Sequence, residues 1–295
     1  MEQESSAKLE ALNNIEGTSE IGSMNPAQGW MPLDKENLSY NGTLYPAAYQ
    51  FQIKPITAGT AKYFSALDEN SPIAVNDALT YVVEKHIRII HEGKLLNTLQ
   101  TIHEHDRFKL VLLVHLYSGS PTSLSFQGQC THANCYQEQT IDITAKGLQY
   151  SDISEKGLTY LNQETGYFVI ATKSMGTRYF RPLSLAESVE IVEFLHTSRA
   201  KGDIIEQLFL KHAGFFVHDR KAKETISELY QRYLRTTSDI KEVSLLQLIL
   251  EELTIQQSFD LEVTCKSCDN PFQSKITSLQ GLRRIFLVRS VEGEL

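Results

Sequence analysis

The sequence predicts an α+β fold in which small helical bundles are joined to short β-hairpins. Apolar residues recur at helical spacing through much of the chain, and several short segments alternate apolar with polar residues as half-buried strands do. The four cysteines form two pairs, and each pair stands between two alternating segments. We therefore expect a four-cysteine element that joins the two halves of the chain.

Length and composition are typical of a folded globular chain. The 295 residues suffice for one large core or two modest ones, and 41% of them are hydrophobic while 22% are charged. We predict three parts. They are an extended N-terminal arm at 1–28, a domain with strands, helices and a cysteine hairpin at 29–150, and a helical domain that returns to a second cysteine hairpin at 151–295.

Charge and hydropathy disfavour two classes of partner. The formal net charge is −8 and no long Lys/Arg cluster stands against it, which disfavours nucleic acid as a partner. No apolar run approaches the roughly 18 residues needed to cross a bilayer. The acidic, polar start of the sequence is unlike a signal peptide. We therefore expect synthesis in the cytoplasm and no association with a membrane.

The predicted arm, 1–28, lacks a helical or strand period and contains glycines and a proline. Such a segment does not offset its own conformational entropy, about 1 to 2 kcal/mol per residue for the backbone. We expect the arm to become ordered when it docks on a neighbour, with Trp30 and Met31 as its anchors. Deleting residues 1–28 should leave the fold intact and weaken incorporation into an assembly.

The first half contains a predicted strand, three helices and a hairpin. Residues 48–56 alternate apolar and polar side chains as a strand does. Ser71 is a good N-cap, and Pro72 suits the first position of a helix. The helices are predicted at 57–69, 71–91 and 105–117, the last one central because it is apolar on several faces. A β-hairpin with cysteines at its tip is predicted at about 123–144.

The second half loosely repeats this order. A strand is predicted at 167–172, and Ser184 with Glu187 forms a capping box for a helix at 185–198. Further amphipathic helices are predicted near 203–213, 219–235 and 241–255, before a second cysteine-tipped hairpin at about 258–276. The repeat reflects either an internal duplication or only a similar order of elements, and the sequence leaves both explanations open.

The cysteines suggest a single zinc site. Zinc prefers four tetrahedral ligands, and a turn with two thiolates two to four residues apart supplies half of that shell. The C-x-x-C spacing of Cys265 and Cys268 is the usual one, and Cys130 and Cys135 have a looser C-x-x-x-x-C spacing. A zinc-ribbon-like element would then bring together pairs with 129 residues between Cys135 and Cys265.

Three alternatives to this zinc site remain. The cysteines can be buried thiols without a metal, or the site can be a mixed one that uses His132. A redox C-x-x-C pair is the weakest interpretation, because such pairs normally begin a helix after a strand, whereas strand-like sequence flanks these turns on both sides.

Other candidate chemistry is sparse. Residues 101–107, TIHEHDR, contain His103, Glu104, His105 and Asp106, but adjacent positions on a helix diverge by about 100° and cannot all converge on one metal. We therefore attribute them to the polar start of a helix rather than to a metallohydrolase. His218 and Asp219 lie near no assignable nucleophile. Phosphate-binding, dinucleotide-binding and nucleophile-elbow motifs are absent, so we expect no enzyme activity.

Several stretches follow one another in a familiar order: NLSYNGTLYP, FQIKPITAGTAKYF, DALTYVVEKHI, HDRFKLVLLVHLYS, and a cysteine pair before TIDIT. This order resembles the baseplate and baseplate-hub assembly proteins of contractile-tailed bacteriophages. The likeness covers about residues 38–145. The residues that match its frame are Gly42 to Tyr45, Pro55 to Thr57, Asp106, Tyr117, Cys130 and Cys135.

The resemblance implies a structural protein of the virion, a hub or wedge subunit of the tail baseplate that holds neighbouring tail proteins together. Its partners would be other baseplate and tail proteins, with multiple copies in a symmetric assembly. A transient assembly chaperone of the hub remains an alternative. So does a cytosolic zinc-ribbon adaptor that binds a protein partner outside any particle.

Overall fold

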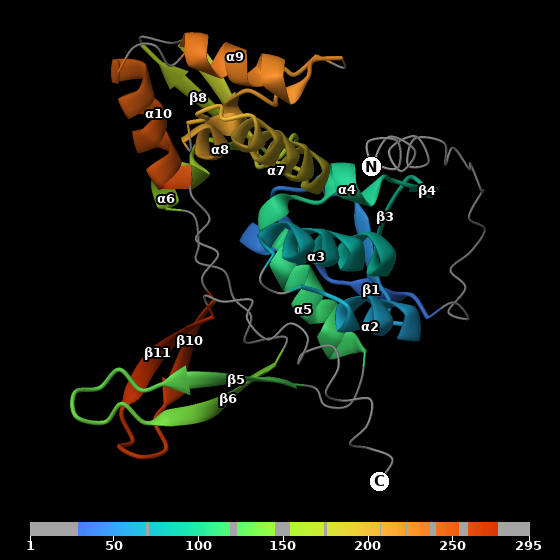
Figure 1. Cartoon of the computed structure of the whole chain (residues 1–295), viewed down its shortest axis with the longest axis vertical. Coiled ribbons are helices and arrows are strands. Elements are labelled where there is room, and N and C mark those ends of the chain that lie inside the picture. The colour runs from blue at the N-terminus through green and yellow to red at the C-terminus, as the bar shows by residue number, and fades with distance from the viewer. Residues whose placement is uncertain are drawn as a thin grey trace.

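The computed structural model describes residues 29–68, 71–118, 123–144, 154–173, 176–206, 208–221, 223–236, 240–253 and 259–276. The predicted arm at 1–28 lies outside the described residues. Figure 1 shows three regions from top to bottom: helices and a small sheet from the second half, helices and a sheet from the first half, and a pair of β-hairpins. The predicted α+β class, with helices beside small hairpins, is confirmed.

The first region is an antiparallel sheet covered by helices. Its strands pair in chain order: β1 (Met31–Leu33), β2 (Gln50–Ile53), β3 (Ile87–His91) and β4 (Lys94–Leu95). Its helices are α2 (Ala58–Ser65), α3 (Pro72–His86), α4 (Thr98–Thr101) and α5 (Arg107–Tyr117), with short 3-10 turns at η2 (Lys35–Asn37), η3 (Ser39–Gly42) and η4 (Glu104–Asp106).

The predicted helix at 71–91 is wrong in its last turn. Ser71 caps α3 as expected, accepting a hydrogen bond from the backbone N–H of Ala74. The helix ends at His86, and Ile87–His91 form strand β3, with Ile87 opposite Ile53 of β2. β-branched isoleucines favour a pleated strand, and here a neighbouring strand is present to pair with them.

The core of the first region lies between this sheet and the helices. Helix α5 is buried on nearly every face, as predicted for a central helix, and even Lys109 is only 4% exposed. The predicted anchors of the arm contact their own chain. The Trp30 ring lies 4.9 Å from the Lys54 ammonium and 4.4 Å from the Arg88 guanidinium, and Met31 pairs with Ile53.

The second region packs helices on a three-stranded antiparallel sheet. The strands are β7 (Leu161–Asn162), β8 (Tyr167–Thr172) and β9 (Gly176–Phe180), and the helices are α6 (Glu155–Leu158), α7 (Leu185–Ala200), α8 (Leu208–His212), η6 (Ala213–Phe215), α9 (Ile226–Thr236) and α10 (Ile240–Leu253). The capping box is confirmed, because Ser184 and Glu187 exchange both bonds at the start of α7.

A single segment, 38–45, enters both cores. Leu38 and Tyr45 belong to the buried cluster of the first region, whereas Tyr40 and Leu44 belong to that of the second. The segment turns sharply because Tyr40, Asn41 and Gly42 all adopt left-handed backbone angles. This segment therefore packs the two halves against each other.

The third region consists of two antiparallel hairpins that are far apart in sequence, one near the middle of the chain and one at the end of the described residues. The first is formed by β5 (Ser123–Gln129) and β6 (Glu138–Thr144), and the second by β10 (Phe259–Thr264) and β11 (Pro271–Ile276). Both hairpins were predicted, with the cysteines at their tips. Among the described residues no helix combines the length and apolar character needed to cross a membrane.

Candidate metal centre

The two hairpin tips have the same local design. In each, the N–H of the residue two positions after the first cysteine donates to that cysteine's sulfur: His132 to Cys130 Sγ and Ser267 to Cys265 Sγ, both at 3.4 Å. The N–H of the first cysteine donates at 3.0 Å to the carbonyl that closes the turn, from Gln137 in one tip and Asn270 in the other. The residue after the second cysteine has a left-handed backbone in both tips, as shown by Tyr136 and Asp269.

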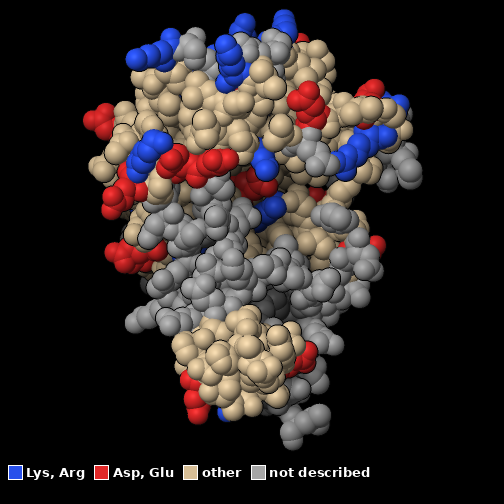
Figure 2. All heavy atoms as spheres, turned by 90° about the vertical axis from the view of Figure 1, so that its left-hand side faces the viewer, with Lys and Arg blue, Asp and Glu red and all other residues tan. Residues whose placement is uncertain are grey.

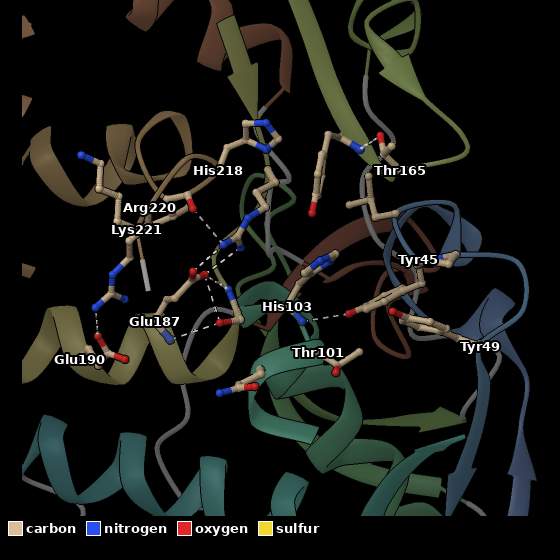
Figure 3. Close-up of a pocket in the computed structure, with 17 residues that line it drawn as sticks. Tyr45, Tyr49, Thr101, His103, Thr165, Glu187, Glu190, His218, Arg220 and Lys221 are labelled. Carbon is tan, nitrogen blue, oxygen red and sulfur yellow. Dashed lines mark hydrogen bonds and ion pairs between the residues drawn. The ribbon is translucent and has the colours of Figure 1, made fainter. Parts of the chain in front are cut away.

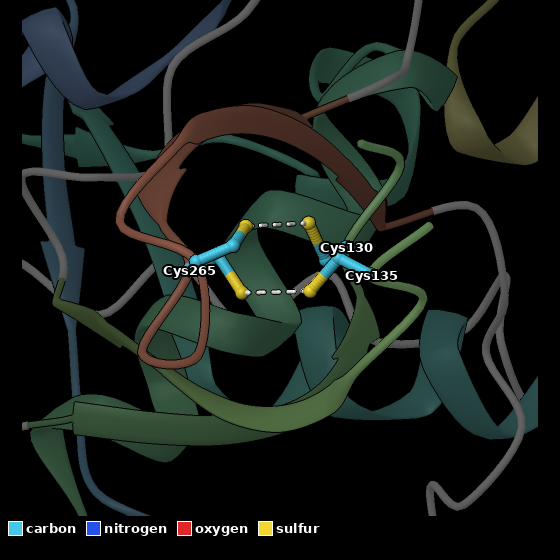
Figure 4. Close-up of side chains that lie close together, drawn as sticks. Cys130, Cys135 and Cys265 are labelled. Atoms are coloured by element: carbon cyan, nitrogen blue, oxygen red, sulfur yellow. Dashed lines mark hydrogen bonds between the residues drawn. The ribbon is translucent and has the colours of Figure 1, made fainter. Parts of the chain in front are cut away.

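The four sulfur atoms lie close together although the pairs are far apart in sequence. Cys135 Sγ lies 3.6 Å from Cys265 Sγ, and Cys130 Sγ lies 3.9 Å from Cys268 Sγ. All four lie within 4.8 Å of one another. Figure 4 shows the sulfurs of the two tips facing each other. The predicted cluster of four cysteines is therefore present.

These distances distinguish between two kinds of sulfur chemistry. A disulfide needs about 2.05 Å between sulfurs, so all four cysteines are free thiols. A tetrahedral shell with metal–sulfur bonds of about 2.3 Å has sulfur–sulfur edges of about 3.8 Å. The two sulfur–sulfur contacts between the tips, 3.6 and 3.9 Å, lie on either side of that value. The cluster therefore has the dimensions of a four-thiolate metal-binding site.

The surroundings of the sulfurs differ between the cysteines. Cys130 and Cys265 are fully buried, and Cys135 and Cys268 are half-buried. Burial raises the pKa of Cys130 to about 12. Hydrogen bonding with Asn270 lowers the pKa of Cys268 to about 6. One thiolate is thus favoured near neutral pH, and a bound cation would favour the thiolate form of the others.

Gln139, which the sequence did not single out, connects the two hairpins. Its side-chain amide donates to the Thr264 carbonyl at 3.2 Å and accepts from the Lys266 N–H at 2.9 Å. Only 8% of the residue is exposed. A buried glutamine satisfied by the opposite backbone fixes how one tip faces the other. Its position on a strand beside the cysteine turn gave no signal, because the partners belong to a hairpin over a hundred residues away.

The other predicted residues have different outcomes. The side chain of His132 is exposed, and its ring is not part of the sulfur cluster. Asp219 makes an ion pair with Arg232 at 2.8 Å, and His218 lies between Tyr167 and Tyr179. Glu104 begins the 3-10 turn η4 and lies outside the His103 cluster described next.

The four residues His103 to Asp106 do not all converge, as expected, but three of them, His103, His105 and Asp106, do lie close together. One potential ligand atom of each lies within 4.8 Å of those of the other two. The expectation assumed one continuous helix, but His103 has an extended backbone, with φ −77° and ψ 145°, and only then does the 3-10 turn η4 begin. The changed backbone direction at His103 allows side chains that a helix would separate to point to one place.

His103 also lies at the wall of a cavity of about 550 Å³ between the first and second regions. Figure 3 shows His103 and Tyr45 at one side of this cavity, and His218, Arg220 and Lys221 at the other. Most of the charged side chains that line this cavity form ion pairs with one another. Arg220 contacts Glu190 at 2.7 Å, and Arg181 forms a bidentate pair with Glu187.

Comparison of the chain with protein-family models, with curated proteins and with solved structures found no match. The chemistry of the cysteine centre is therefore inferred from its own geometry and composition. Four thiols at tetrahedral spacing, with each pair on a hydrogen-bonded turn, suit a soft or borderline metal ion with no vacant coordination position.

Proposed function

We propose that Cys130, Cys135, Cys265 and Cys268 bind one zinc ion with a structural role. The observation that supports this most directly is the sulfur spacing of 3.6 and 3.9 Å across the two tips. Zinc fits because it accepts four thiolates in a tetrahedron and imposes no redox chemistry. A closed shell of four sulfurs leaves no position for a substrate or an activated water, so the ion stiffens the fold rather than acting as a catalyst.

Among the described side chains, the sulfurs lie in a small buried cluster that also includes residues of helix α5. The buried cluster of this region consists of Leu112, Leu116, Cys130, Ile141, Cys265 and Phe272. Two of its members are the cysteines themselves, and two come from helix α5. Zinc can supply on the order of 10 kcal/mol in small zinc-finger peptides. In this chain the ion would connect two hairpins and attach both of them to α5.

A cobalt-loaded sample tests the zinc site. Cobalt(II) in a four-thiolate site gives an intense sulfur-to-metal charge-transfer absorption, which nitrogen and oxygen ligands do not produce. We expect this absorption in the full chain, its displacement by zinc, and its loss in Cys265→Ser. The His132→Gln variant is the matched control and should retain it. Absence of the absorption in the reduced full chain would exclude the site.

We further propose that the chain is a structural subunit of a contractile-tail baseplate. The order of motifs along residues 38–145 supports this, as does the way three of the matching positions relate in space. The Tyr45 hydroxyl donates to Asp106 at 2.6 Å, and Gly42 forms the turn that leads to Tyr45. Gly42, Tyr45 and Asp106 match the family frame at separate places in the sequence, yet they lie in one buried group. Their contact in space is a physical reason for the three matches to occur together.

A subunit of an assembly also needs a surface that can form an interface with a neighbouring protein. The tip of the β5–β6 hairpin is uncharged from Thr131 to Gln137, and Tyr136 is 62% exposed there. Figure 2 shows this tip as an uncharged face in the lower part of the molecule. An uncharged surface with an exposed aromatic residue is typical of the centre of a protein–protein interface.

Mass spectrometry of purified phage particles tests the baseplate role. We expect peptides of this chain in intact particles and in isolated baseplates, in a fixed ratio to other tail proteins. Absence from particles together with binding to tail proteins in infected cells would favour the assembly chaperone. A chain that stays monomeric and contacts no tail protein would favour the zinc-ribbon adaptor.

A further inference from the structure

A second cluster of metal-ligating side chains lies at the junction of the first and second regions, away from the cysteines. It consists of His103, His105 and Asp106, between helices α4 and α5. The backbone here is attached to the second region by an isolated antiparallel bridge between His103 and Ser184. The bridge consists of two hydrogen bonds: the Glu104 N–H donates to the Leu183 carbonyl at 2.8 Å, and the Leu185 N–H donates to the Ile102 carbonyl at 2.9 Å.

The carboxylate of Asp106 is fixed in orientation before any ligand binds. Its Oδ1 accepts from the Ser39 N–H at 2.8 Å and from the Ser39 hydroxyl at 2.7 Å, and its Oδ2 accepts from the Tyr45 hydroxyl at 2.6 Å. Each carboxylate oxygen has two acceptor positions. Oδ1 is therefore fully used, while Oδ2 retains one position, and it lies 3.7 Å from His105 Nε2.

His103 carries the polar atom that this arrangement leaves unexplained. Its Nδ1 is buried and has no hydrogen-bond partner among the described residues. A buried polar atom without a partner costs about 1 to 3 kcal/mol, so a native structure usually supplies one. The ring is stacked on Tyr45 with 4.4 Å between ring centres, and its backbone N–H donates to the Tyr45 hydroxyl at 3.0 Å. Tyr45 thus positions both His103 and Asp106.

The spacing of the three side chains matches a metal-binding site. One potential ligand atom of each lies within 4.8 Å of those of the other two. Nitrogen and oxygen ligands at 2.0 to 2.2 Å in a tetrahedron lie about 3.4 Å apart. The 3.7 Å between His105 Nε2 and Asp106 Oδ2 is too long for a hydrogen bond and within a few tenths of that edge.

We propose that His103, His105 and Asp106 form a second metal site, for a divalent ion of the zinc class. Two imidazoles and a carboxylate are a common zinc ligand set, and the hydrogen bonds from Tyr45 and Ser39 to the carboxylate are the outer contacts that orient such ligands. Three protein ligands leave a fourth position for water or for a group from outside. Cavities of about 550 and 370 Å³ reach the site, one lined by His103 and the other by His105.

The two sites predict different spectra, which allows a direct test on the full chain. Chelator-treated protein would be loaded with zinc or cobalt(II), desalted, and analysed by elemental mass spectrometry and absorption. We expect about two ions per chain. In Cys130→Ser/Cys265→Ser, about one cobalt ion should remain, with the ligand-field bands of a nitrogen and oxygen site and no sulfur charge-transfer absorption.

Two single variants locate this second ion. His103→Gln and His105→Gln should each lower the zinc content by about one ion per chain and leave the sulfur charge-transfer absorption of the cysteine site unchanged. Glu104→Gln, which lies between them in sequence and outside the cluster, is the matched control and should bind as the wild type does.

Two results would overturn the second site. One is a wild-type chain whose bound cobalt shows only the four-sulfur spectrum. The other is an unchanged metal content in both histidine variants. If either variant does not fold, the double cysteine variant and the wild-type spectrum still decide the question, because neither alters the histidines.

Discussion

The cysteine hairpins and the first region both join chain segments that are distant in sequence, but by different means. The first region buries a broad apolar cluster between its sheet and helices, and Asp106 adds hydrogen bonds at its edge. Among the described side chains, the hairpins form a smaller buried cluster with helix α5, and two of its six members are cysteines of the four-sulfur group. Potential metal ligands are therefore part of the buried contacts between the hairpins, whereas the first region associates through apolar side chains and hydrogen bonds.

The largest expected effect comes from removing one thiolate. Cys265→Ser should abolish cobalt and zinc binding at the sulfur site and release the two hairpins from each other. The loss of stability should be several kcal/mol, less than the roughly 10 kcal/mol typical of small zinc fingers, because other cores remain. Amide hydrogen exchange checks this, since Val263 and Gln139 should exchange faster while amides of α3 keep their protection.

Removing the carboxylate of Asp106 tests how far its hydrogen bonds hold the distant segments of the first region together. Asp106→Ala leaves the Ser39 N–H, the Ser39 hydroxyl and the Tyr45 hydroxyl buried without their acceptor. We expect a loss of about 3 kcal/mol in chemical denaturation. Asp219→Ala is the matched control. It breaks an exposed ion pair with Arg232 and should change stability by less than about 1 kcal/mol. Equal losses in the two variants would contradict this account of Asp106.

A methyl group at Gly166 tests the segment that packs the first region against the second. Gly166 has a φ of +72°, and a Cβ there would lie 2.3 Å from the Leu44 carbonyl oxygen. Gly166→Ala should therefore cost about 2 kcal/mol, since backbone must shift as well as adopt a strained angle. Gly202→Ala has a similar φ of +84° with nothing within 4 Å, and should cost only about 1 kcal/mol. Thermal unfolding of both variants gives the comparison.

The smallest expected effect is a dependence on pH through His86. The residue is fully buried, its Nε2 lies 2.8 Å from the Thr60 hydroxyl, and burial lowers its pKa below the ordinary 6.5. A lowered pKa in the folded state means that stability is complete above the unfolded value and declines as pH falls below about 6.5. Denaturation at pH 7 and pH 5 should show a smaller decline in His86→Asn than in the wild type. An equal decline would assign the dependence to other groups.

Much of the fold could be predicted because its signals are local. Ser184 and Glu187 predicted the start of α7, and Ser71 predicted the start of α3, since each cap is made within one turn. The boundary between α3 and β3 was not predictable in this way. Residues 87–91 continue an apolar helical pattern, and they become a strand because β2 offers a pairing edge that the local sequence does not reveal.

The two candidate sites differ in the same respect. By itself the sequence determined the cysteine turns, because residue type and spacing within a few positions fix where a pair of sulfurs points. Only the tertiary structure decided that these pairs meet, since 129 residues lie between Cys135 and Cys265, and that His103, His105 and Asp106 converge. These three side chains can converge because His103 has an extended backbone, and the same residue forms a β-bridge with Ser184. Local chemistry can specify a ligand pair, but the relative position of distant pairs depends on how the intervening chain packs.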